Sequence, residues 1–138
     1  MDIKVMLTDG GHMPTKAHED DAGWDLYALE PARIRPGRAA VFHTGVHIEL
    51  PHGTVGLIMS RSGLNINNGL QCEGVIDSGY CGEIRVKLYN HGRHKVDILA
   101  GQRIAQLLIM PLTAATLVDS YSITGGDRGN NGFGSSGK

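Results

Sequence analysis

Polar and apolar residues alternate along much of the chain, which is the pattern of β-strands that bury one face. The clearest example is 83–89, where Ile84, Val86 and Leu88 share one face. The same pattern predicts a strand over 45–50, and the turn signal at 51–53 indicates a returning strand over 54–59. Further strands are expected over 3–7, 95–99 and 103–110. The last of these has a more continuous apolar run, so we expect it to be buried on both faces.

Turn residues separate these runs at intervals of about 8–12 residues, which is typical of an all-β sandwich or barrel. Only 62–68 has room for a short helical turn. Glycine accounts for 20 of the 138 residues, about twice its usual share of roughly 7 %. Many tight turns between short strands would use glycine in this way. The sequence therefore predicts one all-β domain.

After Tyr121 the sequence is dominated by glycine, serine and asparagine, with Phe133 as its one aromatic residue. A segment of this kind has too little apolar surface to form a core. We therefore expect a β domain over 1–124 and a mobile arm over 125–138. Arg128 and Phe133 favour an arm that closes over a ligand, and a frayed terminus is the alternative.

The charges nearly balance, with 13 Lys and Arg against 14 Asp and Glu. This argues against nucleic acid or an anionic membrane as the main partner, but it permits a small anionic ligand. The chain has no run of 18 apolar residues and no secretory signal, so we expect a cytoplasmic protein, in the host cytoplasm if it is viral. Cys72 and Cys81 are expected to be free, buried thiols. The seven histidines lack metal-binding spacing.

Two segments suit the binding of phosphate. Arg61 follows an apolar strand, and its guanidinium group can clamp phosphate oxygens while Ser62 and the Gly63 amide donate beside it. A solvated surface turn explains that segment equally well. In the arm, the glycine amides and the hydroxyls of Ser135 and Ser136 can cradle phosphate oxygens.

Two acidic residues are candidates for chemistry. Asp77 follows residues of strand character and precedes a glycine-flanked turn with Tyr80, so its carboxylate can be held to orient and deprotonate a water. The alternative is an aspartate that caps a hairpin turn, with Tyr80 packed against a strand end. Asp25 lies inside a strand and needs a partner, either the hydration shell of a metal or an arginine.

Five segments resemble, in order, the five motifs of the trimeric dUTPases: 22–28, 60–64, 74–83, 101–107 and 128–137. The resemblance implies a β jelly roll, a homotrimer with shared active sites, and Mg²⁺ bound through the triphosphate. It also implies hydrolysis of dUTP to dUMP and pyrophosphate by in-line attack of water on the α-phosphorus. That reaction keeps uracil out of DNA and supplies dUMP for dTMP synthesis.

The resemblance also implies roles for individual residues. Asp77 would activate the water and accept a hydrogen bond from the sugar 3′-hydroxyl, Tyr80 would lie beneath the deoxyribose, and Asp25 would contact the magnesium through water. The phosphates would be held by Arg61, Ser62, Gly63, Gln106, Arg128, Ser135 and Ser136. The base and sugar would be contacted by Gln71, Gly74, Ile76, Asp77, Tyr80, Phe133 and Gly134. Many relatives have asparagine at the position of Gln71.

Two other functions are compatible with parts of this pattern. A dCTP deaminase resembles the family in fold and would need a proton-shuttling glutamate, for which Glu73 and Glu83 are available. Release of ammonia from dCTP would identify it. A nucleotide-sensing module that binds a regulatory protein is the other, and a pull-down with a non-hydrolysable dUTP analogue would detect that partner.

Overall fold

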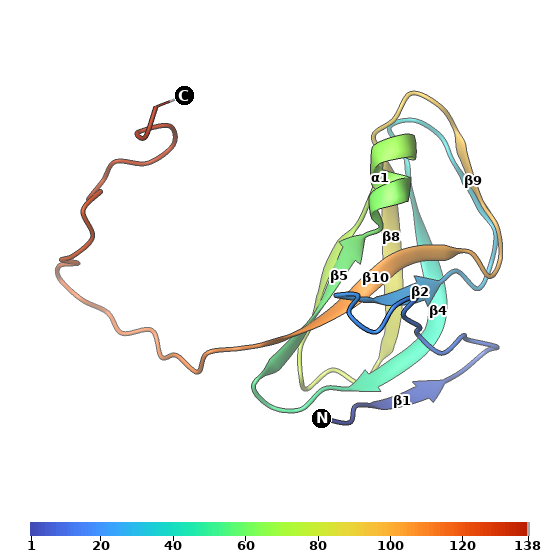
Figure 1. The fold of residues 1–138 in the computed structure, drawn as a ribbon, viewed down its shortest axis with the longest axis horizontal. Coiled ribbons are helices and arrows are strands. Elements are labelled where there is room, and N and C mark those ends of the chain that lie inside the picture. The colour runs from blue at the N-terminus through green and yellow to red at the C-terminus, as the bar shows by residue number, and fades with distance from the viewer. Residues whose placement is uncertain (138) are drawn as a thin grey trace.

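Two antiparallel four-stranded sheets face each other in the computed structural model, which describes residues 1–137 (Figure 1). The strand orders are β1–β4–β8–β6 and β2–β10–β5–β7, and β3 pairs with β9 beside them. The strands are β1 (Lys4–Leu7), β2 (Trp24–Tyr27), β3 (Ala32–Ile34), β4 (Ala39–Glu49), β5 (Thr54–Ser60), β6 (Leu70–Gln71), β7 (Glu73–Ile76), β8 (Glu83–Asn90), β9 (Val96–Ile98) and β10 (Arg103–Pro111). The helix α1 spans Ser62–Asn68.

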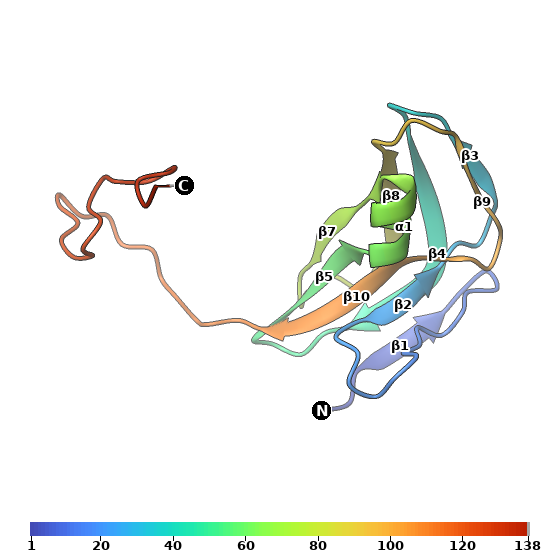
Figure 2. The same cartoon turned by 45° about the horizontal axis from the view of Figure 1, so that its top comes forward.

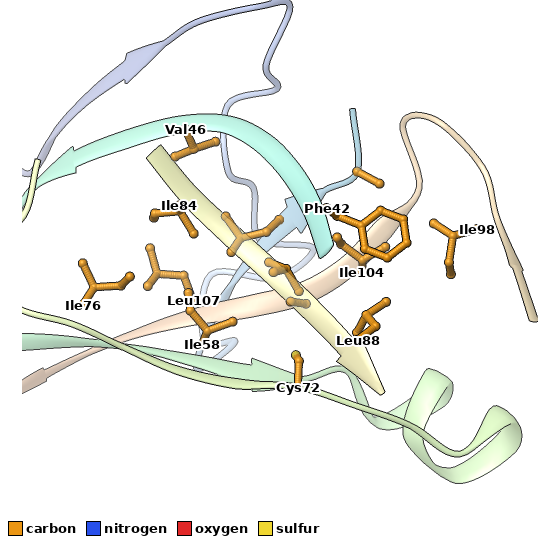
Figure 3. Close-up of a cluster of buried hydrophobic side chains, with 14 of the residues drawn as sticks. Phe42, Val46, Ile58, Cys72, Ile76, Ile84, Leu88, Ile98, Ile104 and Leu107 are labelled. Atoms are coloured by element: carbon orange, nitrogen blue, oxygen red, sulfur yellow. The ribbon is translucent and has the colours of Figure 1, made fainter. Parts of the chain in front are cut away.

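The core lies between the two sheets and is built from the inward positions of each strand (Figure 3). On β8 these are Ile84, Val86 and Leu88, each at most 1 % exposed. Phe42 of β4 and Ile104 of β10 belong to the same buried cluster. Burying a side chain of this size stabilises the fold by about 1.5–3 kcal/mol. The predicted all-β fold is therefore confirmed, and its two sheets form a jelly-roll sandwich.

Most predicted elements appear within a residue or two of their expected bounds. The runs at 54–59 and 83–89 become β5 and β8, and the expected helical turn is α1. Strand β4 begins well before 45, at Ala39, because pairing with β8 extends a segment whose own alternation is weak. The sequence pattern does not predict β3 or β6, which have three and two residues.

Two expectations about burial are wrong. In β10, Ala105 is fully buried, but Leu108 is only half-buried and Met110 is 45 % exposed, so the strand is not covered on both faces along its length. Of the two thiols expected to be buried, that of Cys72 is buried, and burial raises its pKa. Cys81 is exposed because it lies in the turn between β7 and β8 instead of in a strand.

Beyond β10 the chain leaves the body of the protein as an extended segment (Figure 2). All described residues from 112 to 137 are exposed, including Phe133. This segment begins earlier than the predicted arm, whose start at 125 remains a prediction, and Lys138 lies outside the described residues. Within 1–137, no helix has the length and apolar character needed to cross a membrane.

Candidate active site

A polar pocket lies where β2 and β10 meet the beginning of α1. The predicted residues Asp25, Arg61, Ser62, Gly63 and Gln106 all line it. They come from three separate parts of the chain, which the sheet order β2–β10–β5 and the β5–α1 connection bring together. We refer to this site as the polar pocket.

Asp25 is the centre of the polar pocket and has two arginine partners. The Arg61 Nε donates to Oδ1 at 2.9 Å, and the Arg103 Nη1 donates to Oδ2 at 3.4 Å. The Asp25 side chain is only 14 % exposed, so the strand-interior acid finds the cationic partner that its burial requires. A guanidinium group has five N–H donors, so Arg61 keeps its two terminal NH₂ groups for an anion in the pocket.

Gln106 lies beside this network, opposite Asp25 in the β2–β10 ladder. Its Nε2 donates to the Ser60 carbonyl oxygen at 2.9 Å, which fixes the amide group. Gly23 makes this position possible, because a Cβ at residue 23 would lie 2.7 Å from the Gln106 Oε1. Gly23, in the segment 22–28, therefore provides space for the side chain of Gln106, in the segment 101–107.

A second pocket, which we call the turn pocket, lies along β7 and the start of β8. Four predicted residues line it: Gly74, Ile76, Asp77 and Tyr80. The turn is closed by the Tyr80 amide, which donates to the Asp77 carbonyl oxygen at 3.0 Å. Asp77 is exposed and directly follows β7, so its backbone is held by the sheet while its carboxylate is open to solvent.

Tyr80 is held against the backbone of the same turn. Its hydroxyl group donates to the Glu83 carbonyl oxygen at 2.9 Å. A Cβ at Gly82 would lie 2.5 Å from the Tyr80 Cζ, so the ring occupies the space that any other residue at 82 would fill. The phenol ring is thus fixed as a wall of the turn pocket.

The single chain does not bring all the predicted residues together. The polar pocket and the turn pocket have no lining residue in common. Gln71 lines a different hollow, with Cys72, Glu73, Tyr89 and His91. The predicted arm residues lie on the extended segment, exposed and away from the body: Arg128, Phe133, Gly134, Ser135 and Ser136.

Arg103 of the polar pocket and Arg85 of the turn pocket were not predicted as site residues, and Glu83, which also lines the turn pocket, was named only for the deaminase alternative. Arg103 begins a strand whose pairing with β2 brings it to Asp25, and the available signal is its place in the segment 101–107. Alternation places Glu83 and Arg85 only on the polar face of an amphipathic strand. The pocket beside that face becomes visible only in the folded chain.

The residues of the polar pocket fit a magnesium ion held indirectly. Among the described residues, no group of three or more His, Cys, Asp or Glu side chains could hold a metal by itself. Each Asp25 oxygen accepts one hydrogen bond from an arginine and retains acceptor capacity, which suits a contact to metal-bound water. The donor set therefore fits Mg²⁺ bound mainly through phosphate oxygens.

Comparison with known proteins places this arrangement in a family. The dUTPase family model matches residues 9–137. The chain is similar to the deoxyuridine 5′-triphosphate nucleotidohydrolase of Clostridium tetani, with 40 % identity over 136 residues, covering 96 % of this chain and 94 % of that one. It is 44 % identical over 142 residues to the enzyme of the same name from Tropheryma whipplei strain Twist, covering 100 % and 97 %.

Solved structures agree with this result. The Staphylococcus bacteriophage 80alpha dUTPase with dUpNHpp has a TM-score of 0.94 and 30 % identity, and 99 % of each chain is covered. A point mutant of the dUTPase from phage phi11 of S. aureus, described with a structural Mg(II) ion, has a TM-score of 0.82 and 27 % identity over 88 % of this chain and 98 % of that one. The chain belongs to the dUTPase family. Its predicted enzyme class, dUTP diphosphatase, is thereby confirmed.

Proposed function

We propose that this protein hydrolyses dUTP to dUMP and pyrophosphate by Mg²⁺-dependent, in-line attack of water on the α-phosphorus. The observation that carries the proposal is the polar pocket, in which a nearly buried aspartate orients two arginines beside a fixed amide. Such a set of fixed donors suits the charge that develops on a phosphoryl group and its leaving pyrophosphate.

Asp77 is the proposed general base. Its position directly after β7 supports this role, because a carboxylate on a rigid element can hold and deprotonate one water. A positioned general base contributes about 10²–10⁴-fold to the rate. We also assign to Asp77 the acceptance of a hydrogen bond from the sugar 3′-hydroxyl, because it shares the turn pocket with Tyr80.

The turn pocket suits a deoxyuridine. The Tyr80 ring would lie under the sugar and leave no room for a 2′-hydroxyl. Strand β7 is at the edge of its sheet, so half of its backbone N–H and C=O groups face away from β5. Around Gly74 and Ile76, these groups can form hydrogen bonds with the edge of a uracil base. The place of Gln71 in another hollow argues against a direct contact with that base.

The triphosphate would occupy the polar pocket, with Arg61, Ser62, Gly63 and Gln106 as donors. Asp25 would hold Mg²⁺ through water, and the bound ion would spread the negative charge of the leaving pyrophosphate. The arm would complete the site, with Arg128, Ser135 and Ser136 on the phosphates and with Phe133 and Gly134 over the uracil. Closing the arm would exclude water and commit the substrate.

We further propose that each active site is assembled from several copies of the chain in a homotrimer. Two facts support this: the two pockets share no lining residue, and the segment after β10 extends away from the body (Figure 1). A ligand that needs both pockets and the arm is best served when a neighbour supplies the missing part.

The test is release of pyrophosphate from dUTP, with UTP, dTTP and dCTP as matched substrates, each with and without Mg²⁺. We expect rapid release from dUTP alone, and loss of that release when EDTA removes the metal. Ammonia from dCTP would identify a deaminase instead. No release from any of the four by a folded protein would contradict the proposed function.

A further inference from the structure

His47 of β4 contacts the turn that carries Asp77 and Tyr80, and His43 of the same strand contacts Glu83, the first residue of β8 after that turn. His43 and His47 both lie on the outer face of the strand, and the β4–β8 ladder shifts register between them, so that His47 is opposite Glu83. Neither histidine lines the polar pocket or the turn pocket. They lie behind the turn and can act on it only through its backbone and Glu83.

His47 is held from both sides of its ring. Its Nδ1 is 3.0 Å from the Cys81 carbonyl oxygen, and its Nε2 is 3.2 Å from the Thr8 Oγ1. A carbonyl oxygen only accepts, so Nδ1 carries the hydrogen and donates. In the neutral ring, Nε2 then accepts from the Thr8 hydroxyl group. Because Cys81 directly follows Tyr80, this bond fixes the backbone beside the tyrosine.

His43 acts on the other side of the same turn. Its Nδ1 is 2.8 Å from the Glu83 Oε1, and the Glu83 carbonyl oxygen accepts the hydrogen bond from the Tyr80 hydroxyl group. The Glu83 side chain is 21 % exposed. Arg85, opposite His43 in the ladder, is the charged neighbour on this face and lines the turn pocket. Glu83 is thus fixed at its side chain by His43 and bonded at its carbonyl to Tyr80.

The precision of the Tyr80 ring matters because of what it must exclude. An apolar wall discriminates only weakly between two ligands that differ by one added hydroxyl group. Stronger discrimination requires that the wall does not move aside for the larger ligand. Groups that define a site must be held within about 0.5 Å by their supporting contacts. The His47 and His43 contacts are of this supporting kind.

We propose that His47, assisted by His43, is a positioning residue that holds the Tyr80 turn and thereby sets the discrimination between dUTP and UTP. This inference rests on the proposed function, since it concerns the sugar selectivity of the same site. The contacts predict an effect on the ratio of kcat/KM for dUTP to that for UTP, beyond any effect on the rate with dUTP alone.

The test compares two substitutions of one residue. His47→Leu removes both ring hydrogen bonds, whereas His47→Asn keeps an N–H donor near the place of Nδ1. We expect His47→Leu to lower the dUTP-to-UTP ratio about 5- to 10-fold, the effect of one net hydrogen bond. His47→Asn should stay within about twofold of the wild type. His52→Leu, in the exposed turn after β4, is the control and should leave the ratio unchanged.

A wild-type ratio in His47→Leu, or equal losses on both substrates, would overturn the inference. If His47→Leu does not fold, Thr8→Val replaces it, because it removes only the hydroxyl group that bonds to Nε2. That variant should lower the ratio about twofold, and an unchanged ratio would again overturn the inference. The proposed function fails by a different observation, which is that the wild-type protein releases no pyrophosphate from dUTP.

Discussion

The polar pocket and the turn pocket both contain fixed side chains, but different interactions hold those side chains in place. In the polar pocket, side chains hold one another: Asp25 orients Arg61 and Arg103 through ion pairs. In the turn pocket, the backbone holds the side chains: Tyr80 rests on Gly82 and donates to the Glu83 carbonyl oxygen. The ion pairs of the polar pocket suit the recognition of a charged ligand group, because fixed arginine side chains bind an anion more selectively than mobile ones. The backbone contacts of the turn pocket suit discrimination by shape, because a rigid wall excludes a ligand that is too large.

The two pockets should therefore fail in different ways when residues are changed. Loss of a charge partner in the polar pocket should weaken the binding of phosphates. Displacement of the wall in the turn pocket should change which sugar is accepted. Loss of the carboxylate of Asp77 should abolish the hydrolysis of dUTP and leave the binding of dUTP intact.

The largest expected effect is that of Asp77→Asn. The amide keeps the shape but cannot take a proton, so kcat for dUTP should fall by about 10²–10⁴-fold while dUTP still binds. Single-turnover kinetics and calorimetric titration measure the two properties. Asp97→Asn is the control, since that carboxylate pairs with Arg33 on the exposed β3–β9 ladder. A loss of less than about 10-fold in Asp77→Asn would exclude its role as the general base.

Removal of the arm should come next. Deleting 125–138 takes away Arg128, Ser135, Ser136 and Phe133, and should leave the folded body, because the core lies within β1–β10. The loss of charge-assisted bonds to the phosphates should lower kcat/KM by about 10²-fold. Circular dichroism and steady-state kinetics provide the check. Near-normal turnover by the truncated protein would contradict the proposed lid.

Arg61→Gln tests the polar pocket against a matched ion pair. Arg61 and Arg33 each bond an aspartate, at 2.9 Å and 2.6 Å, but only Arg61 lines the pocket. We expect Arg61→Gln to lower kcat/KM for dUTP by about 10-fold or more, the effect of a hydrogen bond from a charged group. Arg33→Gln should leave kcat/KM unchanged. Equal behaviour of the two variants would mean that Arg61 has only a structural role.

Gly82→Ala should give the smallest change, and mainly in selectivity. The new Cβ must displace the Tyr80 ring, whereas Gly79→Ala in the same turn meets no atom within 4 Å. We expect the dUTP-to-UTP ratio to fall about fivefold in Gly82→Ala and to stay constant in Gly79→Ala. If Gly82→Ala kept the wild-type ratio, the Tyr80 ring would not be the wall that excludes ribose.

The sequence predicted the secondary-structure elements better than it predicted the tertiary contacts between them. Alternation identified β8, because inward positions repeat every second residue in a strand with one buried face. The turn signal before 54–59 identified β5 as the returning strand, although its first three residues are all buried. It did not reveal β6, whose two residues depend on pairing with β8. Short pairings of this kind are set by tertiary contacts that a local pattern does not contain.

The same limit applies to the site. The need of Asp25 for a partner was predictable from its place inside a strand, and Arg61 meets that need. The segment 101–107 contains Arg103, but the contact of Arg103 with Asp25 was not predictable, because it depends on the register between β2 and β10. The local pattern did not reveal the separation of the polar pocket from the turn pocket either, since motifs in one sequence order can lie on different sides of a fold. Only the family resemblance, which implies active sites shared between copies, pointed to it.

That separation provides the most direct test of the account, which holds that copies of the chain share each site. Asp77→Asn and Arg61→Gln, each of low activity alone, would be unfolded together in equal amounts and refolded. If one copy supplies Asp77 and another supplies Arg61, random mixing restores both residues in about a quarter of the sites. We predict pyrophosphate release from dUTP near a quarter of the wild-type rate. A rate no higher than the mean of the two variants alone would contradict this claim, because it would show that Asp77 and Arg61 of each site come from the same chain.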